Sequence, residues 1–264
     1  MKTEEHYTCL NCNNNFAGNY CNNCGQQKLG KDEFTMKNFV KNAIGESLEI
    51  DSKLLKTIRL LLFKPGVLTT EYFKGKFQSY WSPVKLYLIC SLLYFVVFYN
   101  FPKHDFYHQE SLYKQDATGL MKKIADAAIA ERNIDREKLN ERFADYASYS
   151  MYIVVFFYSI LFSLIYFYKK MNFVHHFIFS LYLMCFIMLK DVLLFPLYYI
   201  IPTFEPRLAL NIFIICIYSV FSMKEYYKIS LIGSIIRVHL FTVLFWGISF
   251  LLTYLALIIT IYTF

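Results

Sequence analysis

The chain has 264 residues, of which 56% are hydrophobic and 20% aromatic, and its formal net charge is +7. This apolar content excludes an ordinary soluble domain, and the low counts of glycine and proline (9 and 6) exclude a linker or a turn-rich repeat. The positive charge gathers beside the first long apolar segment. It therefore favours an anionic lipid surface as partner, and we expect no nucleic acid. The composition predicts an all-α membrane protein.

Two CxxC pairs stand out in the first 30 residues, and their cysteines are Cys9, Cys12, Cys21 and Cys24. Each pair places two sulfurs on one side of a tight turn, and two such turns facing each other form the tetrahedral thiolate site of a structural zinc. About thirty residues cannot bury a stabilising core without a metal or disulfides. Two disulfides are the alternative, but these residues contain no apolar run, so we expect no export signal. The pattern predicts a zinc ribbon over residues 1–30, with one structural zinc ion.

The residues around the cysteine pairs also carry conformational information. Gly25 follows the second pair and Asn13 follows the first, and both residue types tolerate the left-handed backbone that amides near a thiolate often need. The eight residues between the pairs are expected to form a small hairpin that turns at Gly18. Three further cysteines lie singly in apolar segments and are expected to be packing residues: Cys90, Cys185 and Cys216.

Residues 31–82 are predicted to form an amphipathic basic neck next to the membrane. Between residues 53 and 63 the apolar positions recur at helical spacing, and Pro65-Gly66 should end that helix. The apolar positions are Leu54, Leu55, Ile58, Leu61 and Leu62, and the aromatic residues that follow are Tyr72, Phe73, Phe77, Tyr80 and Trp81. Against one acidic residue, Glu71, the basic residues expected to meet anionic lipid headgroups are Lys53, Lys56, Arg59, Lys64, Lys74, Lys76 and Lys85. This pattern is typical of a segment lying on a membrane surface; the alternative is a charged helix packed on its own domain.

Residues 83–264 are predicted to form a helical membrane domain of about five spans, because about 20 apolar residues cross a hydrocarbon core of about 30 Å. The expected spans are 83–101, 148–168, 173–201, 207–223 and 240–262, the last preceded by an interfacial stretch with Arg237 and His239. Residues 102–147 carry eight basic and nine acidic residues and are expected to form a helical loop outside the cytoplasm. The positive-inside rule places the N-terminus in the cytoplasm and the C-terminus outside.

Lys190 and Asp191 interrupt the third expected span and form a candidate polar site. Lys190 lies about 26 Å along that helix, close to the outer headgroups, and adjacent residues point about 100° apart. We therefore expect an interface anchor without a mutual ion pair; a polar transport path is the alternative. His175 and His176 begin the same span and are expected to be interfacial polar residues, with a metal or proton-relay role as the alternative.

The run Tyr20-Cys21-Asn22-Asn23-Cys24-Gly25-Gln26, followed by Pro65-Gly66, Gly75-Lys76 and Pro83, resembles a bacterial domain-of-unknown-function family. Its members are multi-pass inner-membrane proteins with an N-terminal zinc ribbon of four cysteines. The likeness is specific from Cys9 to about Tyr87, and the family pattern has glycine where this chain has Asn13. The resemblance implies the fold and a bacterial inner-membrane location, and it implies no activity.

The sequence contains no nucleotide-binding glycine loop, no nucleophile elbow and no HExxH pair. The predicted function is therefore a binding, regulatory or scaffold module whose cytoplasmic ribbon docks a protein partner. A small transporter that uses Lys190 and Asp191 is one alternative, and a lipid-modifying membrane enzyme is another.

Overall fold

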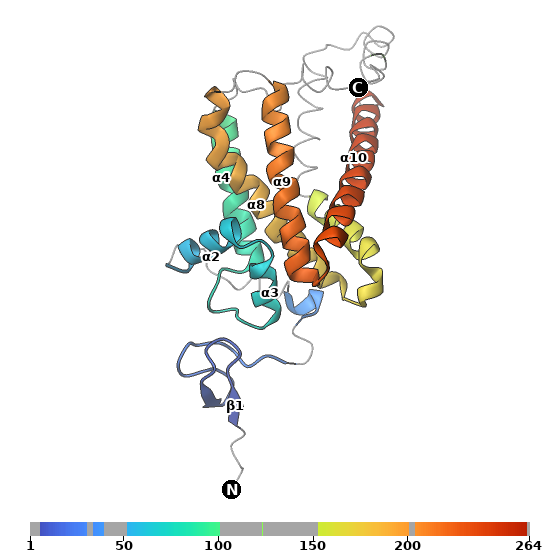
Figure 1. Cartoon of the computed structure of the whole chain (residues 1–264). Helices are drawn as coiled ribbons and strands as arrows, with labels where there is room; N and C mark the ends of the chain where they lie inside the picture. The colour runs from blue at the N-terminus through green and yellow to red at the C-terminus, as the bar shows by residue number, and fades with distance from the viewer. Residues whose placement is uncertain are drawn as a thin grey trace.

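The computed structural model describes residues 6–30, 34–39, 52–100, 123, 153–200 and 204–262. A small β-ribbon, two short neck helices and a bundle of long helices follow one another along the molecule (Figure 1). β1 lies at one end and the last turns of α10 lie at the other (Figure 1). Among these described residues, three helices are long and apolar enough to cross a membrane. The fold is therefore mainly helical, as the composition predicted.

The ribbon consists of two short hairpins. Strands β1 (His6–Thr8) and β2 (Asn15–Ala17) pair antiparallel, and the first cysteine pair lies between them. A bridge between Tyr20 and Gln27 frames the second pair in the same way. Gly18, with φ of 95°, joins the two hairpins, so the prediction of one hairpin turning at Gly18 was wrong. The reason is that each CxxC turn itself reverses the chain and forms the end of a hairpin.

The neck folds as two helices, α2 (Ser52–Phe63) and α3 (Val67–Phe73), and Pro65-Gly66 forms the predicted elbow between them. The apolar stripe of α2 faces protein: Leu61 is buried, and Leu54, Ile58 and Leu62 pack against the same core. The Tyr218 hydroxyl donates a hydrogen bond of 2.8 Å to the Leu61 carbonyl. The expected contact with lipid was therefore wrong for these four residues, whereas Leu55, the fifth residue of the stripe, is 74% exposed. Helical spacing shows that a stripe covers an apolar surface, but it does not distinguish lipid from protein.

The Trp81 side chain is also buried in protein. Its backbone N–H donates to the Thr57 hydroxyl at 3.1 Å, and that hydroxyl donates to the Lys53 carbonyl at 2.7 Å. Trp81 is 3% exposed and Thr57 is fully buried. These bonds fasten the segment before α4 to the middle of α2.

The bundle contains α4 (Pro83–Asn100), an apolar helix Ile153–Ile165, the short turn η1 (Phe167–Lys169), α8 (Phe173–Ile200), α9 (Phe204–Tyr227) and α10 (Leu231–Tyr262). Pro196 lies inside α8 without ending it. α10 is one continuous helix, and its candidate membrane window already begins at Leu231, so the structure shows no break between the expected interfacial stretch and the expected span from residue 240. Arg237 fits within this helix because its guanidinium donates to the Gly233 carbonyl and to the Tyr168 hydroxyl, each at 3.0 Å. The predicted loop at 102–147 lies outside the described residues, apart from Lys123.

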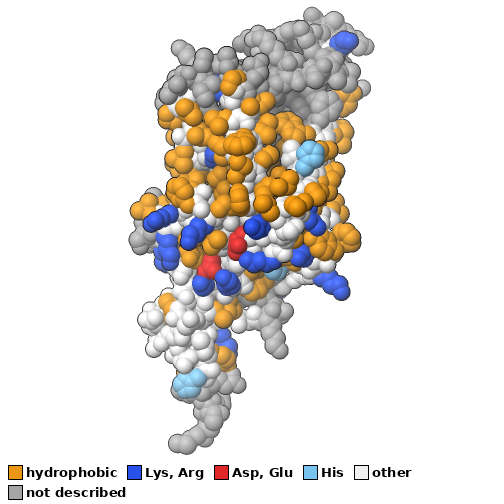
Figure 2. All heavy atoms as spheres, viewed as in Figure 1, with side chains coloured by type: hydrophobic (Ala, Val, Ile, Leu, Met, Phe, Trp, Pro, Cys, Tyr) orange, Lys and Arg blue, Asp and Glu red, His pale blue; other side chains and the backbone are white. Residues whose placement is uncertain are grey.

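The long helices differ in how much protein surrounds them. In their apolar windows, 72% of the α8 residues are buried, against 28% for α9 and 11% for α10. α8 is therefore the central helix, with α4 packed along it. Figure 2 shows a broad band of apolar side chains over the bundle, with a belt of Lys and Arg beside it on the side facing the ribbon. A wide apolar band next to a basic belt is typical of a membrane protein.

Candidate metal centre and neighbouring sites

The four ribbon cysteines meet in one cluster, as predicted. Their sulfur atoms all lie within 4.8 Å of one another. Cys9 Sγ lies 3.6 Å from Cys24 Sγ, and Cys12 Sγ lies 3.6 Å from Cys21 Sγ. Disulfide sulfurs are about 2.05 Å apart, whereas four sulfurs bound tetrahedrally to zinc at about 2.3 Å are about 3.8 Å apart. The geometry therefore fits a metal held by four thiolates and does not fit two disulfides.

The two cysteine pairs share one backbone design. The N–H of Asn13 donates to the Cys9 carbonyl, and the N–H of Gly25 donates to the Cys21 carbonyl, each at 2.8 Å. Both residues have a left-handed backbone, with φ of 58° for Asn13 and 71° for Gly25. The expected conformational role of Asn13 is confirmed. Two equivalent turns face each other and place all four sulfurs around one point.

The amides of these turns favour thiolates. Burial raises the pKa of Cys21, but hydrogen bonds from the backbone amides of Cys24 and Asn23 outweigh it and lower the pKa to about 6. The backbone amide of Asn14 lowers the pKa of Cys12, whereas burial raises that of Cys24 to about 11. Since metals bind the thiolate, the turns prepare part of the ligand set before a metal arrives.

Gln26, two residues after the last cysteine, fixes the ribbon to the neck. It is 3% exposed. Its Nε2 donates to the Gly75 carbonyl at 2.7 Å, and its Oε1 accepts the N–H groups of Phe77 at 3.2 Å and Gln78 at 3.5 Å. One side chain thus satisfies three backbone groups in the loop between α3 and α4.

Two further contacts support the same joint. The Ser79 hydroxyl donates to Asn11 Oδ1 at 2.7 Å. A Cβ at Gly75, where φ is 82°, would lie 2.9 Å from the side chains of both Leu10 and Leu29. The ribbon and the loop therefore fit closely at this glycine. In the printed sequence the joint shows only as a glutamine after Cys-Gly, which by itself gives no partner.

We expect Gln26→Ala to loosen this joint and to leave the metal centre intact. Each buried polar group left without a partner costs about 1–3 kcal/mol. Hydrogen exchange followed by mass spectrometry should show the amides of Phe77 and Gln78 exchanging faster in this variant, with unchanged metal content. Gln27→Ala, at the exposed neighbouring position, is the matched control. Equal protection in both variants would contradict the role of Gln26.

The basic neck residues are mostly exposed. Lys85 lies over the Trp81 ring at 4.3 Å, and Lys56 lies over the Tyr80 ring at 4.7 Å. The exposed residues of the predicted set are Lys53, Lys56, Arg59, Lys64 and Lys74, and the half-buried ones are Lys76 and Lys85. The neck therefore buries its apolar side in protein and presents its basic side outward.

Glu71 is the acidic residue of this basic stretch, and it is 9% exposed. Its carboxylate binds Lys74 Nζ at 2.8 Å and also binds Lys76 Nζ. Burial raises the pKa of Glu71, but the hydrogen bonds from both lysines outweigh it and hold the pKa below its usual value. The carboxylate therefore links the end of α3 to the loop that receives Gln26.

Replacing Glu71 by Gln should lower the thermal unfolding midpoint in detergent at pH 7, since charged hydrogen bonds of about 1.5–3 kcal/mol each are weakened. A lowered folded-state pKa gives stability that is present above the unfolded value, about 4.3, and is lost as pH falls through the folded value. The difference between the two proteins should thus vanish in acid. Glu225→Gln, in an exposed pair with Lys228, should have little effect. A Glu71 effect that persists unchanged in acid would refute the ionic explanation.

Lys190 and Asp191 come together with a residue that the sequence did not indicate. Lys190 is 4% exposed, its Nζ lies 2.5 Å from Asp191 Oδ1, and it also binds Asn211 Oδ1 of α9. The expectation that these two neighbours would not form an ion pair was wrong. The lysine side chain is long enough to reach the adjacent carboxylate although the two residues point about 100° apart on the helix. Lys190 is buried between helices, so its ammonium group binds protein partners here, and its expected interfacial depth stays a prediction. Arg207, one turn before Asn211 on α9, is buried as well.

Two histidine–tyrosine pairs join the starting turn of α8 to the end of α9. His175 Nδ1 lies 2.8 Å from the Tyr226 hydroxyl, and His176 Nδ1 lies 2.9 Å from the Tyr227 hydroxyl. The Phe73 ring of α3 stacks on His175 at 3.9 Å between ring centres. His176 is 1% exposed, so its side chain meets protein, and its expected interfacial depth stays a prediction. Paired aromatic and histidine doublets at the ends of two apolar segments are the pattern that could have indicated these contacts.

These features define a mainly helical protein with three candidate membrane-crossing helices and a four-cysteine cluster that could bind a metal ion. Residues 51–95 match the model of a family described as Protein of unknown function (DUF3667). The match covers the neck from residue 51 and most of α4, including Pro65-Gly66 and Gly75-Lys76, and it does not extend to the four ribbon cysteines. No curated protein and no solved structure matches the chain.

Proposed function

We propose that the protein is an adaptor of the bacterial inner membrane whose zinc-bound ribbon docks a protein partner in the cytoplasm. The observation that carries this proposal is the joint made by Gln26, which holds the ribbon in a fixed place below the neck. A ribbon that served only to stabilise its own segment would not need a buried side chain committed to three groups of another element. In this proposal the metal is zinc and its role is structural.

The ribbon surface away from the joint suits recognition by hydrogen bonds and one aromatic contact. Tyr20 is 61% exposed. Residues 6–30 contain no acidic residue. The exposed asparagines of the ribbon are Asn13, Asn15, Asn19, Asn22 and Asn23. Tyrosine and asparagine side chains together supply rigid contact area and adaptable hydrogen bonds.

The proposed orientation places the N-terminus in the cytoplasm and the C-terminus outside. The ribbon and the basic belt lie on the same side of the apolar band (Figure 2), and basic residues favour the cytoplasmic side. The seven basic residues of the neck would then lie at anionic headgroups, each attracted by about 1 kcal/mol. The bilayer and its anionic lipids are thus partners in the same proposal.

The proposal predicts a protein partner that depends on the folded ribbon. A tagged full-length chain, cross-linked in its native membrane, should retain a defined protein that a Cys21→Ser, Cys24→Ser variant loses. Tyr20→Ala should weaken this capture while the metal content stays the same. Cys216→Ser, outside the ribbon, is the control and should retain the partner. Identical captures from all four proteins would refute the adaptor function.

A transporter is the second candidate, and the buried cluster of Lys190, Asp191 and Asn211 favours it. Charged groups inside apolar spans are costly and often mark a transport path. In this structure Lys190 binds both Asp191 and Asn211, and its bond to Asn211 also joins α8 to α9. Loss of a transmembrane solute or proton flux in Lys190→Gln, with the ribbon intact, would favour transport over the adaptor.

A further inference from the structure

A groove opens where the elbow of the neck meets the end of α9. It has a volume of about 490 Å³, and the residues along it include Phe63, Pro65, Phe221 and two lysines, Lys64 and Lys224. The volume lies within the range of small-molecule sites, about 300–1,000 Å³. The groove thus has both apolar walls and positive charge.

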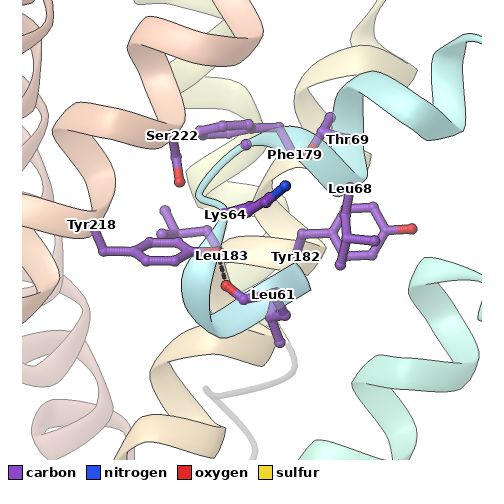
Figure 3. Close-up of a pocket in the computed structure, with 10 residues that line it drawn as sticks. Leu61, Lys64, Leu68, Thr69, Phe179, Tyr182, Leu183, Tyr218 and Ser222 are labelled. Carbon is purple, nitrogen blue, oxygen red and sulfur yellow. Dashed lines mark hydrogen bonds between the residues drawn. The ribbon is translucent and has the colours of Figure 1, made fainter. Parts of the chain in front are cut away.

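Gly66, beside this groove, packs closely against α9. Gly66 has φ of 79°, and a Cβ there would lie 2.6 Å from the Ser222 carbonyl oxygen. Figure 3 shows the Leu61 carbonyl of the neck bound to the Tyr218 hydroxyl of α9, beside a small cavity that Lys64 and Ser222 also line. That cavity has a volume of only about 10 Å³, room for one water at most. The elbow is therefore fitted tightly to α9, and the groove beside it is a fixed feature.

The groove residues combine what the two halves of a phospholipid require. Phe63 is 76% exposed and Phe221 is 48% exposed, which is unfavourable in water and favourable against acyl chains. Lys64 and Lys224 are exposed, and neither makes an ion pair with another described residue. Glu225 also lines the groove, and its carboxylate is already bound to Lys228 at 2.7 Å. Two lysines are thus left to bind an anion.

The groove lies where the proposed membrane placement puts the lipid headgroups. Lys224 lies in the last turn of α9, near the end of a candidate span that runs to Tyr227. Lysines at the end of a span lie where lipid phosphates are, and the adjoining apolar side chains face hydrocarbon. The two phenylalanines are therefore suited to contact an acyl chain, and the two lysines are suited to bind the phosphate of the same lipid.

We infer that this groove binds one anionic phospholipid, with its phosphodiester between Lys64 and Lys224 and the upper part of an acyl chain against Phe63 and Phe221. The inference rests on the membrane placement in the proposed function. It goes beyond general attraction to a basic belt, because it assigns a particular site to a particular lipid class. The site would hold the neck elbow against α9 at the membrane surface.

Native mass spectrometry of the full-length protein with phosphatidylglycerol and with phosphatidylcholine tests the site. One phosphatidylglycerol should be retained on the wild-type protein, with no comparable binding of phosphatidylcholine. Lys64→Gln, Lys224→Gln should weaken this binding by roughly 30-fold, since each lysine contributes about fivefold. Lys169→Gln, Lys170→Gln removes the same charge outside the groove and the neck and should change little. Equal losses in the two double variants would show a general charge effect and overturn the site.

The apolar wall and the source of the phosphate are tested in the same way. Phe63→Ser should weaken phosphatidylglycerol binding, whereas Leu55→Ser, at a position 74% exposed on the same helix, should not. Inorganic phosphate should not compete, and competition by it would indicate a simple anion site. Alkaline extraction of membranes checks the underlying placement separately. A protein that stays in the membrane but shows no preference for phosphatidylglycerol would overturn the groove alone, and one that is extracted would overturn the membrane placement.

Discussion

Replacing Cys21 and Cys24 together by serine is expected to remove the metal completely and to unfold the ribbon. Three residues form the buried cluster of this module, Cys9, Phe16 and Cys21, and two of them are ligands. So small a core cannot hold 25 residues folded, whereas a structural zinc contributes about 10–16 kcal/mol in small zinc-binding peptides. Metal analysis should fall from one equivalent per chain to none. Hydrogen exchange across residues 6–30 should lose its protection at the same time.

The loss should also reach the neck, because Gln26 is positioned by the second cysteine turn. The amides of Phe77 and Gln78 should exchange faster, as expected for the Gln26→Ala variant. Cys216→Ser should leave both the metal and the exchange unchanged. A ribbon that stays protected without metal, or four cysteines found as disulfides in freshly isolated membranes, would rule out a structural metal centre.

Gly66→Ala is expected to be the most damaging single substitution of the neck. The left-handed backbone costs an alanine about 1 kcal/mol, and the overlap with the Ser222 carbonyl at 2.6 Å forces the elbow away from α9. Overpacking typically adds about 1–3 kcal/mol, so the total loss should be about 2–4 kcal/mol. The thermal unfolding midpoint in detergent should fall accordingly.

Two other glycines separate the causes of that loss. Gly18 also has a positive φ, of 95°, but nothing lies within 4 Å of its Cβ position, so Gly18→Ala measures the backbone cost alone. Gly247 lies in α10 with open space and an ordinary helical backbone, and Gly247→Ala should be neutral or slightly stabilising. If Gly66→Ala is no worse than Gly18→Ala, the contact with α9 does not matter for stability.

The sequence predicted features that depend on local chemistry. The spacing of Cys9, Cys12, Cys21 and Cys24 predicted that their sulfur atoms form one cluster, because each CxxC turn places its two sulfurs close together. The periodicity between residues 53 and 63 predicted α2, and Pro65-Gly66 predicted its end. In each case the information lies within a few residues of the feature.

Features that depend on contacts between distant segments could not be predicted. The stripe through Leu61 has the same spacing whether it meets lipid or the Tyr218 helix. Asn211 lies 21 residues from Lys190, and Gln26 lies about 50 residues from the loop that it binds. A single sequence does not state which polar side chain meets which backbone group across such distances. The structure supplies that information through packing.

The three long helices are buried by protein to different extents, and this difference decides what the hydropathy of each helix indicates. α8 is as apolar as a membrane span, yet its side chains would be equally apolar in the middle of a water-soluble bundle, since protein surrounds most of them. The outer face of α10 has no such explanation: Ile232, Ile236, Val243 and Trp246 are all more than half exposed. Apolar character left uncovered by the protein is the stronger mark of a bilayer, so α10 and not α8 best indicates the solvent in which this fold belongs. In purification, the same face is the surface that detergent must cover first to keep separate molecules from adhering to one another.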